Sequence, residues 1–88
     1  MILIKVGGGA TINLDGIAKD LAVLNKPTLV VHGANALRDD LAKDLGHPTR
    51  RITSVSGVES VFTDANALKV LTMAYAGIVN KHFVQLCQ

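Results

Sequence analysis

A lysine and the glycines that follow it near the start of the chain are the residues best suited to do chemistry. Lys5 lies in an apolar run, Ile2–Val6, that leads directly into Gly7, Gly8 and Gly9. A lysine is rarely buried in a strand, because removing an ammonium group from water is costly unless an anion pairs with it. Ligands of open α/β sheets bind at the carboxyl ends of the strands, so this position is suited to hold a phosphate. An edge-strand lysine that points into solvent is the alternative.

The three glycines lack the side chains that would keep a ligand away from the backbone. Their N–H groups are suited to form a nest for phosphate oxygens. The turn is not a P-loop, because GxxxxGK followed by Ser or Thr is absent. It also departs from the dinucleotide-binding fingerprint, since Ile12 stands where a small residue is needed. A glycine turn of purely steric origin is the alternative.

A second apolar run, Thr28–His32, opens into Gly33, Ala34 and Asn35 just before a helical pattern. Free backbone N–H groups at a helix N-terminus attract anions, so this turn predicts a second cradle beside the first. We expect His32 to brace the loop by hydrogen bonding rather than to act as a general base. An ordinary strand–turn–helix connection capped by Asn35 is the alternative.

Apolar periodicity places both turns in a βαβ unit. Met1–Val6 is apolar and rich in β-branched residues, which is typical of a parallel strand covered on both faces. Asn13 is expected to cap a helix whose apolar face runs from Leu14 to Leu24. With the strand Thr28–His32, the unit takes about thirty residues, the usual length of a right-handed βαβ crossover.

The middle of the chain predicts one more helix and a hairpin. Asn35 is expected to cap the second helix, and Gly46 to stand just past its end as the C′ residue. The runs Ile52–Ser56 and Val58–Phe62, on either side of Gly57, predict a short irregular hairpin.

A long amphipathic helix is predicted for the last part of the chain. Thr63 is its expected N-cap, and Gly77 is expected to weaken or kink it midway. The segment Val79–Gln88 contains no Gly, no Pro and no capping pattern, and two parallel strands make a small sheet. We therefore expect these residues to be the N-terminal piece of a larger α/β domain.

Composition narrows the class of protein. With 88 residues the chain makes at most one small domain, and 49% hydrophobic against 18% charged residues favours a packed globular chain. A net charge of +2 and only three aromatic residues argue against nucleic-acid binding. No apolar run reaches the length of a membrane span, and no secretory signal precedes the first strand. The single cysteine, Cys87, excludes an internal disulfide, and no metal-ligand spacing is present. We expect a cytoplasmic location.

Four motifs occur in an order that resembles the amino-acid kinase family over all 88 residues: Lys5-Val6-Gly7-Gly8, His32-Gly33, Gly46-His47-Pro48 and Thr63-Asp64. The most similar branch comprises the members that phosphorylate acetylglutamate, or aminoadipate or glutamate linked to a carrier protein. Residues 52–57 and 73–81 look especially similar to the carrier-linked group.

The resemblance implies a fold and an activity. The fold would be the N-terminal portion of a three-layer αβα sandwich with a mainly parallel sheet. Residues 1–88 would be a partial kinase domain, the substrate-side N-terminal lobe, with the ATP-binding C-terminal lobe absent. The full-length relative would be an ATP- and Mg²⁺-dependent carboxylate kinase of arginine or lysine biosynthesis, and a homodimer. It would phosphorylate the side-chain carboxyl of an N-blocked amino acid, while the fragment alone would be inactive.

The resemblance also implies roles for individual residues. Lys5 would be catalytic, stabilising the transferring phosphoryl group. The first turn, Gly7, Gly8 and Gly9, would lie along the ATP phosphates. The second turn, Gly33, Ala34 and Asn35, would bind the acceptor substrate.

Two departures from the family pattern bear on the acceptor. Ala34 and Asn35 replace two glycines of the family's second turn, and their Cβ atoms narrow the approach to it. Val61 stands where the family carries an arginine that binds the acceptor's α-carboxylate, and Arg38 or Arg50 are the candidates to replace it.

The sequence also allows two other functional hypotheses besides the kinase. One is a non-catalytic module that self-associates through the helix from Thr63, which resembles the segment through which these kinases form dimers. The other is a small anion- or nucleotide-binding α/β domain unrelated to kinases. The kinase and anion-binding readings both require the two turns to meet at one edge of the sheet.

Overall fold

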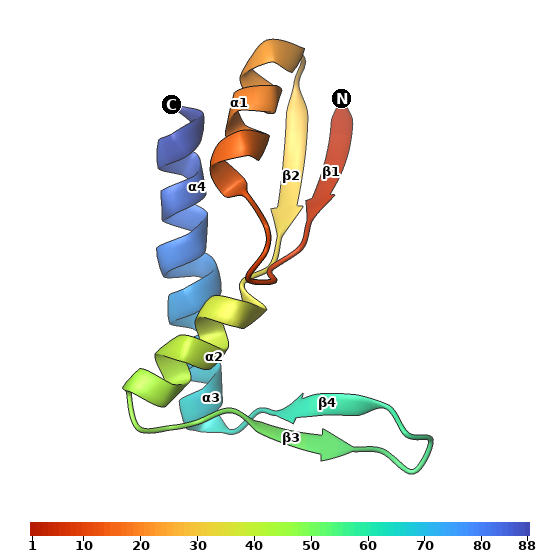
Figure 1. Cartoon of the computed structure of the whole chain (residues 1–88), viewed down its shortest axis with the longest axis vertical. Helices are drawn as coiled ribbons and strands as arrows, with labels where there is room; N and C mark the ends of the chain where they lie inside the picture. Colours follow the sequence, from red (N-terminus) through yellow and green to blue (C-terminus); the bar gives the residue numbers. More distant parts are fainter.

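The computed structural model describes all 88 residues of the chain, from Met1 to Gln88. Its βαβ unit stands at one end of an elongated molecule, and a hairpin projects at the other (Figure 1). The elements in chain order are β1 (Ile2–Val6), α1 (Leu14–Leu24), β2 (Thr28–His32), α2 (Asn35–Asp44), β3 (Arg50–Thr53), β4 (Glu59–Phe62), α3 (Ala65–Thr72), η1 (Met73–Val79) and α4 (Asn80–Cys87). None of the helices combines the length and the apolar character needed to cross a bilayer.

The predicted βαβ unit is present. β1 and β2 pair in parallel, from Ile2 opposite Thr28 to Val6 opposite His32. The Asn13 side chain caps α1 by accepting a hydrogen bond from the Gly16 N–H at 3.0 Å, as predicted. The helix returns the chain to the start of β2, so both strands end at the same edge of the sheet.

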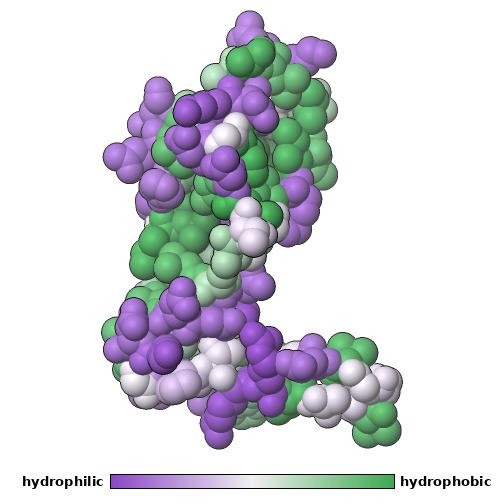
Figure 2. All heavy atoms as spheres, in the orientation of Figure 1, coloured by the Kyte–Doolittle hydropathy of each residue, from purple (hydrophilic) through white to green (hydrophobic).

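Helices cover one face of this two-stranded sheet, which corrects the prediction that β1 is covered on both faces. α1 packs against α4, and both helices lie to the same side of the strands in Figure 1. On the other face Leu3 is 68% exposed, Leu29 54% and Val31 46%. Apolar atoms accordingly line the outer side of the strands in Figure 2. The 88 residues supply two of the three expected layers, because all of their packed helices fall on one side.

The start of α2 differs from the prediction. Asn35 is the first helical residue and not the N-cap; the cap position is Ala34, which has no capping side chain. The carbonyl of Gly8 instead accepts a hydrogen bond from the Ala36 N–H at 3.1 Å. The backbone of the first turn therefore does what a capping side chain does elsewhere.

The end of α2 agrees with the prediction. Gly46 stands just past the helix with a φ of +79°. Its N–H donates to the carbonyl of Lys43 at 3.1 Å, and the N–H of His47 donates to that of Ala42 at 2.9 Å. These two bonds form a Schellman motif, which favours glycine at the C′ position.

The predicted hairpin is present with shifted bounds. β3 and β4 are antiparallel, from Arg50 opposite Phe62 to Thr53 opposite Glu59. The first strand begins and ends earlier than predicted, because Ser54 already belongs to the turn and accepts the Gly57 N–H at 2.9 Å. Every residue of β3 is exposed, and the hairpin projects away from the rest of the chain (Figure 1).

The long helix forms as three consecutive segments. Asp64, not Thr63, is the N-cap, because its carboxylate accepts the Ala67 N–H at 2.8 Å. Gly77 lies within the π-helical segment η1, so the predicted weak point takes the form of a wider turn. The helix buries Val70, Ala74 and Phe83 against the other elements.

Candidate functional site

The two glycine-containing turns meet at the carboxyl ends of β1 and β2. Val6 lies opposite His32 in the last pair of the parallel register. Just beyond it, the Gly33 N–H donates to the Val6 carbonyl at 3.1 Å, and the Ala36 N–H donates to the Gly8 carbonyl at 3.1 Å. The structure thus brings together the two turns that the sequence places 25 residues apart, as Gly8 and Gly33 show.

Gly8 lies so close to the second turn that no side chain fits on it. A Cβ atom built on Gly8 would stand 2.3 Å from the Ala34 nitrogen and 2.5 Å from the Gly33 carbonyl carbon. Both neighbours are backbone atoms, so neither can rotate away. A Cβ on Gly9 meets no atom within 4 Å, although it belongs to the same turn. Close backbone approach, rather than a strained angle, therefore requires glycine at position 8.

Backbone donors without acceptors gather at this junction. The N–H groups of Gly7, Gly8 and Gly9 donate to no acceptor in the chain, and neither does that of Ala34. Ala34 is only 2% exposed, and buried backbone N–H groups without a partner are rare in proteins. The N-terminal end of α2 adds the positive pole of a helix dipole. This arrangement can hold an anion without any charged side chain.

A cavity of about 310 Å³ lies at the two turns. Asp40 is the only charged residue in its lining, and the remainder is backbone or apolar surface. The volume falls at the lower end of the range for small-molecule sites. The lining residues are Gly7, Gly8, Gly9, Ala10, Ile12, Leu14, Gly33, Ala34, Ala36, Leu37, Asp40 and Val79.

Lys5 stands near this cavity but does not line it. Its side chain shares the exposed face of the sheet with Leu3 and Val31, whereas the cavity opens among helix residues such as Leu37 and Val79. The ammonium lies 3.4 Å from the Val6 carbonyl and forms no ion pair. The charge is therefore free to meet an anion at the end of the strand, and its catalytic role stays a prediction.

His32 braces the second turn, as predicted. Its Nε2 lies 3.1 Å from the side-chain Nδ2 of Asn80, the first residue of α4. Its Nδ1 lies 3.4 Å from the Gly33 carbonyl oxygen. The ring is half-buried between the sheet and the long helix, so it acts as a link between them and not as an exposed base.

A second cavity, of about 420 Å³, lies at the base of the hairpin, away from the glycine turns. Arg38, Arg50, Val61 and Asp64 are among its lining residues. It is the larger of the two, but its cations already have partners, whereas the backbone donors of the turn cavity have none. The turn cavity is therefore the better candidate for an anion site.

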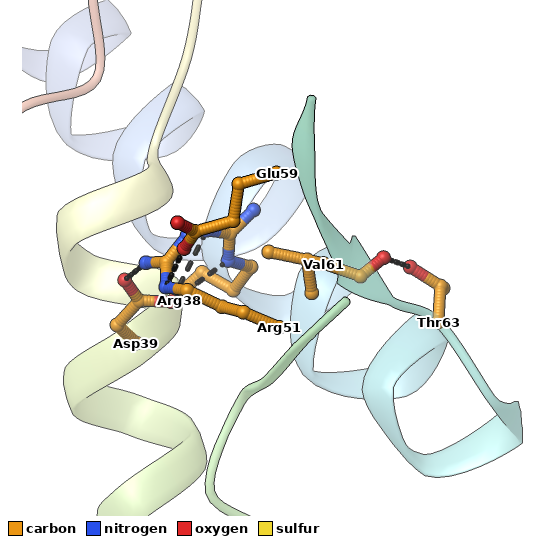
Figure 3. Close-up of polar contacts among 6 residues, drawn as sticks. All are labelled: Arg38, Asp39, Arg51, Glu59, Val61 and Thr63. Atoms are coloured by element: carbon orange, nitrogen blue, oxygen red, sulfur yellow. Dashed lines mark hydrogen bonds and ion pairs between the residues drawn. The ribbon is translucent and has the colours of Figure 1, made fainter. Parts of the chain in front are cut away.

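A chain of ion pairs fastens the hairpin to α2 (Figure 3). The carboxylate of Asp39 lies 3.1 Å from the guanidinium of Arg38 and 3.0 Å from that of Arg51. Arg51 also lies 3.5 Å from the carboxylate of Glu59. The Arg38 side chain is 13% exposed, so its interaction with Asp39 is the least screened of the three.

Arg51 is the residue that sequence reasoning missed. It lies directly opposite Val61 in the antiparallel register, so the two side chains share one face of the hairpin. The two expected replacements, Arg38 and Arg50, line the cavity at the base of the hairpin together with Val61. Arg38 pairs with Asp39, and Arg50 lies 5.2 Å from the Phe62 ring centroid and 3.9 Å from Asp64. Which residue faces position 61 depends on the strand register, and strands placed symmetrically about Gly57 would not have given Arg51.

No group of three or more His, Cys, Asp or Glu side chains is arranged to hold a metal ion. The only cysteine, Cys87, is exposed on α4.

Comparison with known proteins agrees with the geometry of the turns. The family model described as the amino acid kinase family matches residues 1–88. The chain belongs to the amino acid kinase family. The resemblance inferred from the four ordered motifs is therefore confirmed.

Individual relatives include kinases that act on LysW-linked amino acids and an acetylglutamate kinase. The chain is 44% identical to the LysW-aminoadipate kinase of Thermus thermophilus, covering 100% of this chain and 34% of the relative. It is 33% identical to the acetylglutamate kinase of Cytophaga hutchinsonii, with 100% and 33% covered. It is 35% identical to the LysW-aminoadipate/LysW-glutamate kinase of Saccharolobus islandicus, with 92% and 31% covered. The chain thus spans about a third of the length of these curated relatives.

The contact between the turns predicts opposite outcomes for two neighbouring glycines. Gly8→Ala should lower the free energy of unfolding by about 1–3 kcal/mol, the usual cost of forcing extra atoms into a packed site. Gly9→Ala, with open space around its Cβ, should change it by less than about 0.5 kcal/mol. Urea unfolding followed by circular dichroism measures both. Equal stabilities for the two variants would contradict the close contact.

Proposed function

We propose that this chain is the substrate-side N-terminal part of an ATP-dependent carboxylate kinase. The acceptor is the side-chain carboxyl of an N-blocked amino acid, either acetylglutamate or carrier-linked aminoadipate or glutamate, in arginine or lysine biosynthesis. One observation carries the proposal: two turns in backbone contact at one sheet edge, with N–H groups that have no acceptor in the chain. The relatives, two kinases of LysW-linked amino acids and an acetylglutamate kinase, supply the acceptor class.

The reaction needs positioned charge more than it needs side-chain chemistry. An oxygen of the acceptor carboxylate bonds to the γ-phosphorus of ATP, and the bond to the β–γ bridging oxygen breaks, which gives an acyl phosphate and ADP. The first turn lies along the phosphates, and the second holds the acceptor carboxylate. Such transfers depend chiefly on alignment and on donors aimed at the developing charge. Mg²⁺ bound to the nucleotide phosphates supplies further charge neutralisation.

Lys5 supplies the mobile positive charge in this scheme. Its ammonium has no carboxylate partner, so no ion pair has to break before it meets the phosphoryl group. Its stem starts one residue before the end of β1, and the side chain has to reach around that end to serve the turn cavity. The single contact at 3.4 Å to the Val6 carbonyl is a weak restraint on that movement.

Arg51 is our candidate for the group that binds the acceptor's α-carboxylate. The family carries its arginine at the position of Val61, and Arg51 reaches the same face of the hairpin from the opposite strand. Its guanidinium is half-exposed. It offers five donors, and the pairs with Asp39 and Glu59 leave some of them free for a ligand.

A second function is supported by the surface of the long helix. A groove of about 680 Å³ runs between α2 and the segments η1 and α4. Leu45, Met73 and Ile78 line it, and each is 48% exposed. Clustered apolar exposure of this kind favours association with another surface. A non-catalytic module that self-associates through the helix from Thr63 is therefore the alternative proposal.

Kinase function predicts a specific defect when Lys5 is removed. A chimera in which residues 1–88 replace the matching part of the Thermus relative should form acyl phosphate from ATP, trapped by hydroxylamine. Lys5→Ala should lower kcat by about 10²–10³-fold, the usual loss of one transition-state donor. Lys19→Ala serves as the control, because Lys19 pairs with Asp15 on the exposed surface of α1. Undiminished turnover by Lys5→Ala would remove the assigned role.

Acceptor binding distinguishes the two neighbouring arginines of β3. In the same chimera Arg51→Ala should raise the acceptor KM by about 10-fold or more, since a hydrogen bond to a charged group contributes about 1.5–3 kcal/mol. The KM for ATP should not change. Arg50→Ala, which removes a cation stacked on Phe62, should leave both constants near the starting values. A larger acceptor effect from Arg50→Ala would reverse the assignment.

Self-association is tested on the 88-residue chain itself. Sedimentation at micromolar concentration should show a dimer if the groove is an interface, and Ile78→Lys should shift it to monomer. Val84→Lys places the same charge on an exposed position of α4 outside the groove and should leave the dimer intact. A well-folded monomer without either substitution would exclude this module.

A further inference from the structure

A series of side-chain contacts links the start of α4 to the second turn. The ammonium of Lys81 lies 3.1 Å from the Asn80 Oδ1. The Asn80 Nδ2 lies 3.1 Å from the His32 Nε2, across 48 positions of sequence. The His32 Nδ1 lies 3.4 Å from the carbonyl oxygen of Gly33. Both Asn80 and His32 are half-buried.

The hydrogen-bonding capacities of these groups determine where the proton of His32 is. A lysine ammonium can only donate, so the amide oxygen of Asn80 faces Lys81 and its NH₂ faces the ring. The NH₂ can also only donate, which makes His32 Nε2 the acceptor and leaves it without a proton. The proton of the neutral ring is then on Nδ1, where it points at the Gly33 carbonyl.

This proton favours one orientation of the peptide that joins Gly33 to Ala34, through a contact that is long at 3.4 Å. A trans peptide is planar, and its C=O and N–H point in opposite directions. Holding the Gly33 carbonyl toward His32 therefore turns the Ala34 N–H away from the ring. That N–H has no acceptor although Ala34 is 2% exposed, an arrangement that costs free energy and needs a restraint to persist.

We propose that His32 is a positioning residue for the second turn. Asn80 selects the Nδ1–H tautomer, and that proton favours the orientation of the Gly33–Ala34 peptide that leaves the Ala34 N–H available to an anion at the turn cavity. The identity of the anion, either the acceptor carboxylate or the transferring phosphoryl group, rests on the proposed function. The tautomer of His32 does not depend on that function. Lys81 also lines the apolar groove beside α2, so the same contacts connect that groove to the turn.

The test reads the tautomer directly in the 88-residue chain. Long-range ¹H–¹⁵N correlation spectra at mildly alkaline pH should show His32 protonated at Nδ1. In Asn80→Asp the carboxylate can only accept, so the proton should move to Nε2. Asn66→Asp adds the same charge on α3, away from the ring, and should leave Nδ1 protonated. Circular dichroism checks that each variant keeps its helices.

The unsubstituted chain alone can overturn the proposal, because protonation at Nε2 would contradict it without reference to any variant. An Nδ1 proton that stays in place in Asn80→Asp would also contradict the role of Asn80. In the chimera, Asn80→Asp should raise the acceptor KM and leave the KM for ATP unchanged. A tautomer that switches in a chimera without kinase activity would refute the proposed function and leave the positioning contacts established.

Discussion

The contact between Gly8 and the second turn is the constraint on which the rest of this structure depends. It is a contact of backbone with backbone, and a single added carbon would collide with the Ala34 nitrogen. Through the Gly8 carbonyl, the first turn also caps the helix that follows the second. Parallel pairing of β1 with β2 brings the two turns to one edge, and α1 supplies the return that parallel pairing requires. Because the turns pack through main-chain atoms, their donors can serve a ligand while side chains stay outside.

The sequence was most informative where local chemistry decides the outcome. Asn13 caps the start of α1 and Gly46 follows the end of α2, as predicted, because each forms its hydrogen bond with a residue three positions away. The predictions that Asn35 and Thr63 are helix N-caps were wrong, for different reasons. At the start of α2, the carbonyl of Gly8, which is distant in sequence, accepts the hydrogen bond that the Asn35 side chain was expected to accept. At the start of α3, the side chain of Asp64, the residue after Thr63, accepts the capping hydrogen bond. The predicted burial of both faces of β1 was also wrong, since a strand that is apolar on both faces does not show which segments of the chain cover each face.

The candidate site is built from two kinds of structure, the glycine-containing turns and the β3–β4 hairpin. The turns present neutral N–H groups held by the sheet and by α2, whereas the hairpin presents arginines held by carboxylates and, for Arg50, by the Phe62 ring. Asp39 lies between Arg38 and Arg51, and it ties an otherwise exposed pair of strands to the helix that starts at the second turn. The sequence predicted the first kind of structure and missed the second. Which arginine faces Val61 depends on strand register, and the predicted strands were offset from the observed ones.

The π-helical segment in the long helix has a consequence for the phase of its buried face. Ala74 and Phe83 are both buried, yet they lie nine positions apart. A regular α-helix turns by about 100° per residue, so nine residues make about two and a half turns and would set these side chains on opposite faces. The wider turn advances each residue by a smaller angle and so reduces this offset. Because η1 packs on α2 and α4 packs on α1, the length of Met73–Val79 sets the direction in which each part of the long helix presents its buried side chains.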